Sequence, residues 1–144
     1  MDSIKVLVVE DNASFRQFVR NTVEGEIGSV AITEASDGLT AVQLALEIRP
    51  DLIVLDIALP SLDGLEAARR ILKASSASKI LFLSQESSRD VVREAFRIGA
   101  RGYVVKSDAG RELKPALHAV LRGDRFVSRG GDGLNFTTGL KLLV

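Results

Sequence analysis

The sequence predicts an α/β fold, a doubly wound parallel sheet of five strands, from three observations. Short runs rich in β-branched and aliphatic residues alternate five times with segments whose apolar residues recur at helical spacing. The connections between these segments are short, and consecutive strands joined through helices by right-handed crossovers lie parallel in one sheet. The run before Asp56 is continuously aliphatic, which is typical of a strand covered by helices on both faces.

The strands are predicted where aliphatic and β-branched residues cluster. In order, they cover residues 4–9, 29–35, 51–55, 79–83 and 102–105. The second of these is the weakest, because it contains polar residues at several positions. Each run is short enough for a strand and is bounded by polar or turn-forming residues.

A helix is predicted after each strand from apolar residues that recur every three or four positions. These apolar stripes lie within residues 15–23, 41–48, 65–72, 92–96 and 113–121. The first helix can be capped by Asp11 or Asn12, and the turn Asp37-Gly38 leads into the second. Glycine or proline follows the helices, at Gly25, Pro50, Gly99 and Gly123.

Composition excludes several classes of protein. Nineteen basic and nineteen acidic residues balance, so the chain has no electrostatic footprint for nucleic acid or an anionic membrane. There is no cysteine, which excludes disulfides and thiolate metal sites and favours an intracellular, cytoplasmic location. We find no secretory leader and no apolar run long enough to cross a bilayer. Residues 1–127 are predicted to form one domain, and glycine-rich residues 128–144 a linker or tail.

Four strands end on polar side chains. Glu10 and Asp11 follow the first strand, Asp56 the third, Ser84 the fourth and Lys106 the fifth. In an open parallel sheet, ligands bind outside the carboxyl ends of the strands, where the strand order reverses. We therefore expect these residues to converge although they are far apart in sequence.

Three clustered carboxylates repel one another unless a cation lies among them. A hard divalent ion with oxygen ligands, such as Mg²⁺, fits Glu10, Asp11 and Asp56, and zinc fits poorly without cysteine. Lys106 and the Ser84 hydroxyl would complete a cradle for a phosphoryl group, because metal and ammonium can neutralise its oxygens during transfer. Asp56 would then be the covalent acceptor and form an aspartyl phosphate.

The pattern closely resembles the receiver domains of two-component response regulators over about residues 4–127. The matching residues are Glu10-Asp11, Asp56 with Ala58-Leu59-Pro60 and Asp63-Gly64, Ser84, and Gly102-Tyr103-Val104-Val105-Lys106. Gly99-Ala100-Arg101 and the ending Leu121-Arg122-Gly123-Asp124 look most like the NarL/LuxR-type subfamily.

The resemblance implies a CheY-like sheet with the strand order 2-1-3-4-5, and a role for each matching residue. Asp56 would accept phosphate from a histidine kinase. Glu10, Asp11, Asp56 and the Ala58 carbonyl would bind Mg²⁺ or Mn²⁺. Lys106 would pair with the phosphoryl group, and Ser84 and Tyr103 would move toward it and change a binding surface, leading to a phosphorylation-dependent homodimer. Receivers of this subfamily usually precede a helix-turn-helix domain, which Asn135–Val144 does not resemble.

Other interpretations fit less well. A phosphatase of the haloacid-dehalogenase type needs a second aspartate two residues after the nucleophile, where this chain has Ala58. A flavin or dinucleotide module needs a glycine-rich loop after the first strand, where Glu10-Asp11-Asn12 stands. The alternative that we keep is a receiver that is never phosphorylated and serves as a protein-interaction module. The family also often has proline after the lysine, where this chain has Ser107.

Overall fold

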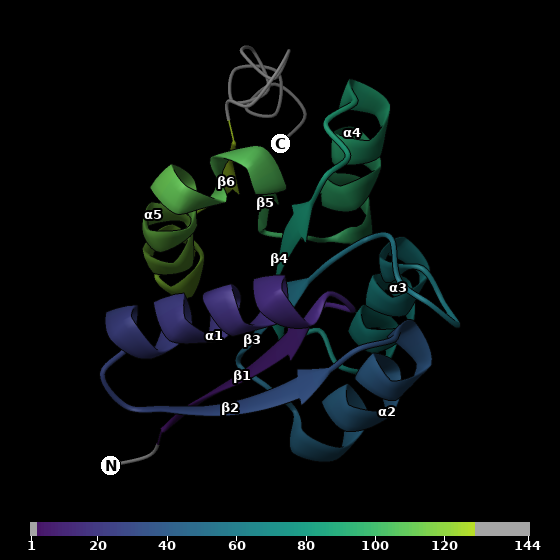
Figure 1. Cartoon of the computed structure of the whole chain (residues 1–144). Coiled ribbons are helices and arrows are strands. Elements are labelled where there is room, and N and C mark those ends of the chain that lie inside the picture. The colour runs from purple at the N-terminus through teal and green to yellow at the C-terminus, as the bar shows by residue number, and fades with distance from the viewer. Residues whose placement is uncertain (1–2, 129–144) are drawn as a thin grey trace.

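A parallel six-stranded sheet forms the centre of the molecule in the computed structural model, which describes residues 3–128 (Figure 1). The strands are β1 (Ile4–Val9), β2 (Val30–Ala35), β3 (Leu52–Leu55), β4 (Lys79–Ser84), β5 (Gly102–Val105) and β6 (Phe126–Val127). Their order across the sheet is β2-β1-β3-β4-β5-β6. The chain leaves β1 for β2 on one side and continues with β3 on the other, so the strand order reverses at β1.

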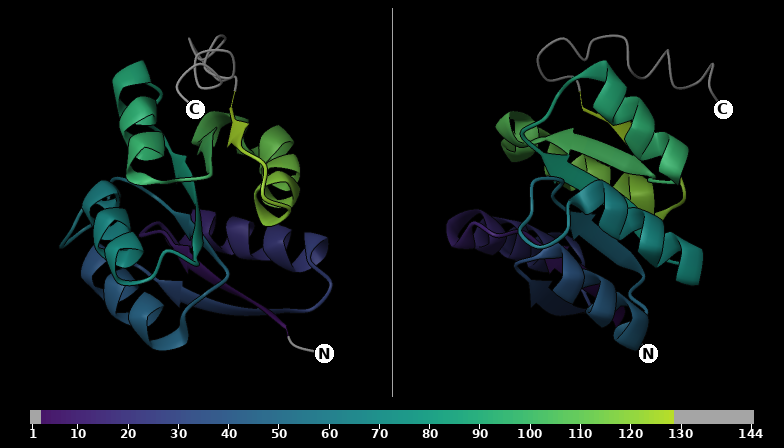
Figure 2. Two further views of the ribbon diagram at one scale, coloured as in Figure 1. Left: turned by 180° about the vertical axis from the view of Figure 1, so that it is seen from behind. Right: turned by 90° about the vertical axis from the view of Figure 1, so that its right-hand side faces the viewer.

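Helices cover both faces of this sheet, as the sequence predicts. They are α1 (Ala13–Glu26), α2 (Gly38–Ile48), α3 (Gly64–Ala74), α4 (Arg89–Ile98) and α5 (Ala109–Leu121), with a short 3₁₀ turn at Lys106–Asp108. Figures 1 and 2 show α1 and α5 on one face and α2, α3 and α4 on the other. None of the helices among residues 3–128 is both long and apolar enough to cross a membrane.

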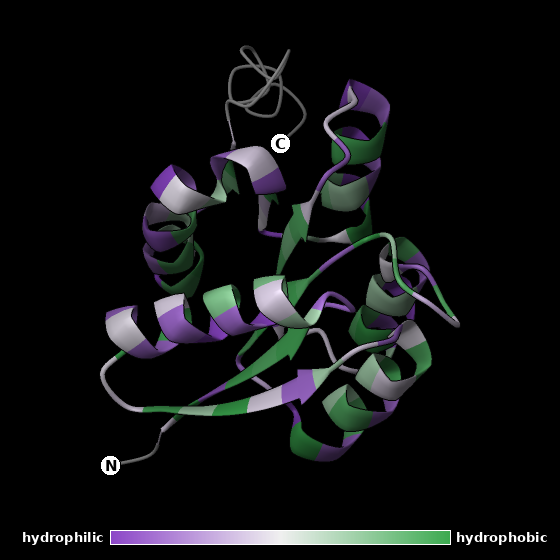
Figure 3. Cartoon of the chain, in the orientation of Figure 1, coloured by the Kyte–Doolittle hydropathy of each residue, from purple (hydrophilic) through white to green (hydrophobic). Residues whose placement is uncertain are grey.

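Each face has its own apolar core, because the strands are apolar on both sides. One core packs Val19, Val23, Leu113 and Leu117 against the sheet, and the other packs residues of α2, α3 and α4 against its opposite face. The central strands and the inward faces of the helices are mostly hydrophobic, while the end of the edge strand β2 is polar (Figure 3). Burial of the apolar side chains in these two cores is the main force that holds the two helix layers on the sheet.

The predicted count of five strands in the order 2-1-3-4-5 is wrong by one strand at the edge. After Gly123, which has a positive φ of 97°, the chain returns along β5 and forms β6. Phe126 N donates to the Arg101 carbonyl (3.1 Å), and Ser128 N donates to the Tyr103 carbonyl (2.8 Å). A two-residue strand is too short to show periodicity, and the free edge of β5 determines its pairing.

The boundary of the predicted tail falls next to this strand. Ser128, the first residue assigned to the tail, is 1% exposed and is hydrogen bonded to β5 through its backbone. The rest of that segment, residues 129–144, lies outside the described residues.

Candidate functional site

Two acidic side chains are held at the point where the strand order reverses. Glu10 follows β1 and Asp56 follows β3, and each extends the sheet by one main-chain bond. Glu10 N donates to the Ala35 carbonyl and Asp56 N donates to the Val9 carbonyl, both at 3.1 Å. Glu10 and Asp56 are each only 3% exposed, so the sheet itself fixes two carboxylates in a nearly buried position.

The first helix leaves a third carboxylate available to this site. Asn12 caps α1 by accepting a hydrogen bond from Phe15 N at 2.8 Å, which decides between the two predicted caps. Asp11 is therefore not used as the cap, and it is exposed beside Glu10 and Asp56. Oxygen atoms of all three carboxylates lie within 4.8 Å of one another. This is the cluster that the sequence predicts.

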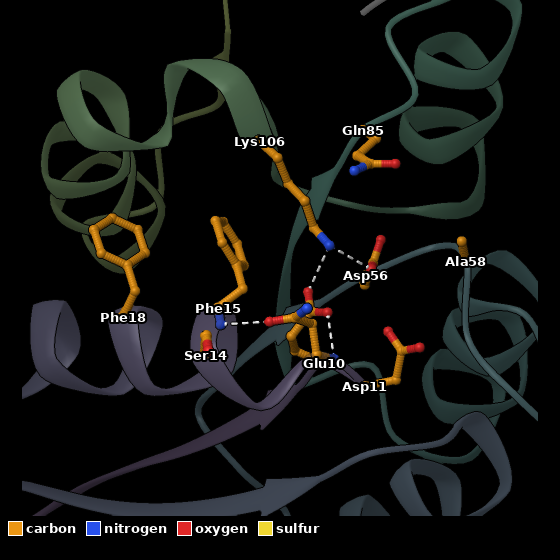
Figure 4. A pocket seen from close by; sticks show the side chains of 10 residues that line it. Glu10, Asp11, Ser14, Phe15, Phe18, Asp56, Ala58, Gln85 and Lys106 are labelled. Carbon is orange, nitrogen blue, oxygen red and sulfur yellow. Dashed lines mark hydrogen bonds and ion pairs between the residues drawn. The ribbon is translucent and has the colours of Figure 1, made fainter.

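Lys106 lies between the two buried acids (Figure 4). Its Nζ is 2.8 Å from Glu10 Oε1 and 2.9 Å from Asp56 Oδ2. Burial alone would lower the pKa of Lys106, but its bonds to Asp56 and Glu10 outweigh burial and raise it. Burial raises the pKa of Glu10, and the nearby Asp56 carboxylate adds to that effect. One ammonium thus faces three carboxylates, and the site has a surplus of negative charge.

Main-chain groups fix the orientation of both buried acids. Ile57 N donates to Asp56 Oδ1 (2.7 Å), and Asn12 N donates to Glu10 Oε2 (2.9 Å). Gly64 lies directly against the backbone of Asp56, where a Cβ atom would be 2.0 Å from the Asp56 carbonyl oxygen. Only glycine fits at this position, which explains why glycine follows Asp63 at the start of α3.

An open pocket of about 550 Å³ lies over the acidic cluster. It is lined by Glu10, Asp11, Asn12, Ser14, Phe15, Phe18, Asp56, Ala58, Gln85 and Lys106. The sequence predicts the two phenylalanines in the apolar stripe of the first helix, and it does not place Gln85 among the site residues, although Gln85 is a large residue next to Ser84 that could affect access to the site. Their proximity in sequence to Asp11 and to Ser84 was the available signal, since residues next to a strand end share its edge of the sheet.

Ser84 and Tyr103 are not among the residues that line this pocket. Ser84 is 2% exposed at the end of β4, and its Oγ accepts a hydrogen bond from Glu86 N (3.2 Å). Tyr103 is fully buried, and its hydroxyl donates to the Glu86 carbonyl (2.6 Å). Burial raises the pKa of Tyr103, so the phenol stays protonated and able to donate. Both residues therefore hold the loop that leads into α4.

A known protein family matches most of this chain. The family described as the response regulator receiver domain matches residues 6–118. The chain belongs to this family. It is a receiver domain of two-component response regulators, and the acidic cluster lies at the place where its strand order reverses.

Its relatives include regulators of transcription and a chemotaxis protein. The chain is 32% identical over 121 residues to the transcriptional regulatory protein LiaR of Bacillus subtilis, covering 84% of this chain and 57% of LiaR. It is 34% identical to the chemotaxis protein CheY of Listeria monocytogenes, covering 79% of this chain and 95% of CheY. The chain thus spans little more than half of the transcriptional regulators that it matches.

A solved structure has the same fold over almost its whole length. It is a two-component response regulator of the LuxR family from Aurantimonas, with a TM-score of 0.83 and 31% identity. The similarity covers 98% of this chain and 99% of that one. The NarL/LuxR-type resemblance that the sequence shows is therefore confirmed.

Proposed function

We propose that this receiver accepts a phosphoryl group on Asp56 from a histidine kinase. The observation that carries the proposal is the contact of Lys106 with both Asp56 and Glu10, which places an ammonium and three carboxylates in one pocket. An Asp56 carboxylate oxygen attacks phosphorus, a P–O bond forms, and the P–N bond of the phosphohistidine breaks. The imidazole leaves with its electron pair and takes up a proton.

The acidic cluster suits a divalent cation, because three carboxylates and one ammonium leave it negatively charged. Glu10, Asp11, Asp56 and the carbonyl of Ala58, which lines the pocket, are the groups that would hold Mg²⁺ or Mn²⁺. When bound, the ion would neutralise charge on the transferring phosphoryl group. Lys106 would pair with the phosphoryl oxygens once the Asp56 carboxylate has become an acyl phosphate.

Ser84 and Tyr103 are positioned to report the change to the surface. If the Ser84 hydroxyl turns toward a phosphoryl oxygen, Glu86 N loses its acceptor and the loop into α4 is released. Tyr103 is bonded to the carbonyl of the same residue, so its contact changes with the loop. The output is then an altered face around α4, β5 and α5 that forms a homodimer. In the intact regulator, the dimer would control transcription through a DNA-binding domain.

The test is the intact mass of the protein after incubation with acetyl phosphate and Mg²⁺. We expect the wild type to gain one phosphate and Asp56→Asn to gain none. The matched control is Asp124→Asn, which removes an exposed carboxylate elsewhere and should label like the wild type. Labelling of Asp56→Asn would move the acceptor to another residue.

Titration calorimetry with Mg²⁺ separates the remaining outcomes. A wild type that binds Mg²⁺ without gaining phosphate would indicate that phosphorylation requires a cognate kinase. The mass measurement would then be repeated with a phosphohistidine-bearing kinase as donor. A wild type that neither binds Mg²⁺ nor gains phosphate would favour the alternative function, a protein-interaction module that is not phosphorylated.

A further inference from the structure

An aromatic ring provides a third contact to the Lys106 ammonium. Nζ lies 4.9 Å from the centroid of the Phe15 ring, within the range of a cation–π interaction. Figure 4 shows this ring beside the end of the lysine side chain, while the carboxylates of Glu10 and Asp56 meet the ammonium from another side. The Lys106 side chain is only 16% exposed, and partial removal from water strengthens such a contact.

We propose that Phe15 is a positioning residue that holds the Lys106 ammonium over the acceptor while its two carboxylate partners change. This inference rests on the proposed function, because it assigns Phe15 a role in phosphorylation of Asp56. It acts through Lys106 and requires no contact of Phe15 with the phosphoryl group.

The two ionic partners of Lys106 do not keep their state during the reaction. Asp56 gives up its free carboxylate when it is phosphorylated, and Glu10 belongs to the cluster that suits a cation. The Phe15 ring is unchanged by either event. A lysine side chain has high rotamer freedom, so a fixed ring face reduces the number of positions that the ammonium can take.

Phe15 is itself held in place from two sides. Its backbone N–H is the group that Asn12 Oδ1 caps at 2.8 Å, which fixes the first turn of α1. Its ring packs against the Phe18 ring, with centroids 5.4 Å apart and planes inclined by 42°. The ring is half-buried and lines the pocket, so it forms part of the pocket wall beside Lys106.

The first experiment compares rates of phosphate gain from acetyl phosphate. We expect Phe15→Leu, which keeps an apolar side chain without an aromatic face, to react about fivefold more slowly than the wild type. Phe15→Tyr keeps the ring face and should restore most of the rate. The matched control Phe126→Leu makes the same change in a half-buried ring of the same apolar core and should react normally.

A double-mutant cycle tests whether the effect passes through Lys106. In a Lys106→Met background, Phe15→Leu should cause no further slowing, because no ammonium remains to be positioned. An equal fivefold loss in both backgrounds would overturn the inference and assign Phe15 a purely structural role. A rate for Phe15→Leu equal to that of the wild type would also overturn it.

A second measurement is independent of phosphorylation. In the wild type, the Lys106 side-chain protons should show an upfield ring-current shift by NMR, which Phe15→Leu removes and Phe126→Leu keeps. If this shift is present but the wild type gains no phosphate from any donor, the contact is real and the proposed function fails. If the wild type is phosphorylated but the shift is unaffected by Phe15→Leu, the inference fails alone.

Discussion

Two groups of carboxylates lie near the carboxyl edge of this sheet, and they have different hydrogen-bond partners. The first is the cluster of Glu10, Asp11 and Asp56, which lines an open pocket and contacts Lys106. The second is the pair Asp108 and Glu112 at the start of α5. Ser128 Oγ donates to Asp108 Oδ2 (3.1 Å) and is also hydrogen bonded to Glu112 Oε1.

The first group lies beside an open pocket, and the second joins two elements of the fold. The pocket cluster has three carboxylates beside the Lys106 ammonium, and its pocket is open, so it could hold a cation. The second pair joins β6 to α5, because Ser128 is buried and its backbone is bonded to β5. We therefore expect changes in the first group to alter ligand binding, and changes in the second to alter only stability.

The largest effect is expected for Lys106→Met. This change removes the ammonium from two carboxylates that are each 3% exposed, and breaking such a pair should lower the free energy of unfolding by about 3 kcal/mol without Mg²⁺. Mg²⁺ should restore much of that stability and bind more tightly than to the wild type, because Lys106 no longer competes for Glu10 and Asp56. Urea denaturation with and without Mg²⁺ measures both effects.

The same titration on Lys114→Met is the control for Lys106→Met, since Lys114 is an exposed lysine on α5 at 4.0 Å from Glu26. It should change neither the stability nor the affinity for Mg²⁺ appreciably. A Lys106→Met variant whose stability does not respond to Mg²⁺ would mean that the pocket carboxylates are not a cation site.

Ser128→Ala should have a smaller effect that is confined to stability. Loss of the hydroxyl that bonds to Asp108 and Glu112 should cost about 1–2 kcal/mol of unfolding free energy. The affinity for Mg²⁺ should not change. Ser76→Ala, an exposed serine, is the control. Weaker Mg²⁺ binding by Ser128→Ala would show that the two acidic groups are coupled and would break the distinction between them.

A still smaller effect is expected in the pH dependence of stability, measured without Mg²⁺. Burial raises the pKa of Glu10 above its ordinary value, so the native state holds more protons than the unfolded state between those two values. The contribution of Glu10 to stability should therefore decrease as pH rises through this window. Glu10→Gln should remove that decrease.

Glu94→Gln provides the control with the opposite sign. Hydrogen bonds from Arg97 and Arg69 lower the pKa of Glu94, so its contribution to stability is lost as pH falls through the lowered value. This variant should flatten the loss of stability in acid. If the free energy of unfolding had the same pH dependence in the wild type and in Glu10→Gln, burial of the Glu10 carboxylate would not contribute to the pH dependence of stability.

The sequence was enough to predict which residues meet at the edge of the sheet. Glu10, Asp56 and Lys106 each follow four consecutive buried residues of a strand, and parallel strands bring their ends together whatever the details of the loops. The contacts between helices and these ends were not predictable in the same way. Phe15 fits the apolar stripe of α1 equally well as a core residue, and only the packing of α1 on the sheet places its ring against Lys106.

The strand β6 at the β5 edge of the sheet was also not predictable from the sequence, for a different reason. Phe126 and Val127 form a strand because β5 offers a free edge and the turn at Gly123 brings the chain back to it. The bonds from Ser128 to Asp108 and Glu112 depend on that return. No local pattern in residues 123–128 contains this information, because the partner strand lies about twenty residues earlier in the chain.

The smallest effect is expected for Arg111→Ala, and it sharpens the comparison most. Arg111 Nη2 lies 2.5 Å from Asp108 Oδ1, yet the arginine side chain is 79% exposed and water screens its charge. Its loss should lower the free energy of unfolding by less than about 1 kcal/mol, as measured by urea denaturation. We expect this to be smaller than the effect of Ser128→Ala, although Arg111 carries a full charge and the Ser128 hydroxyl does not. Arg122→Ala, a change at another exposed arginine, which is paired with an exposed aspartate, is the control and should have a similarly small effect on stability.

A cost for Arg111→Ala that equals that of Lys106→Met would mean that Asp108 needs a cation as much as Asp56 does. The two acidic groups would then differ only in their exposure, and the Ser128 hydroxyl would not be what holds the second one closed.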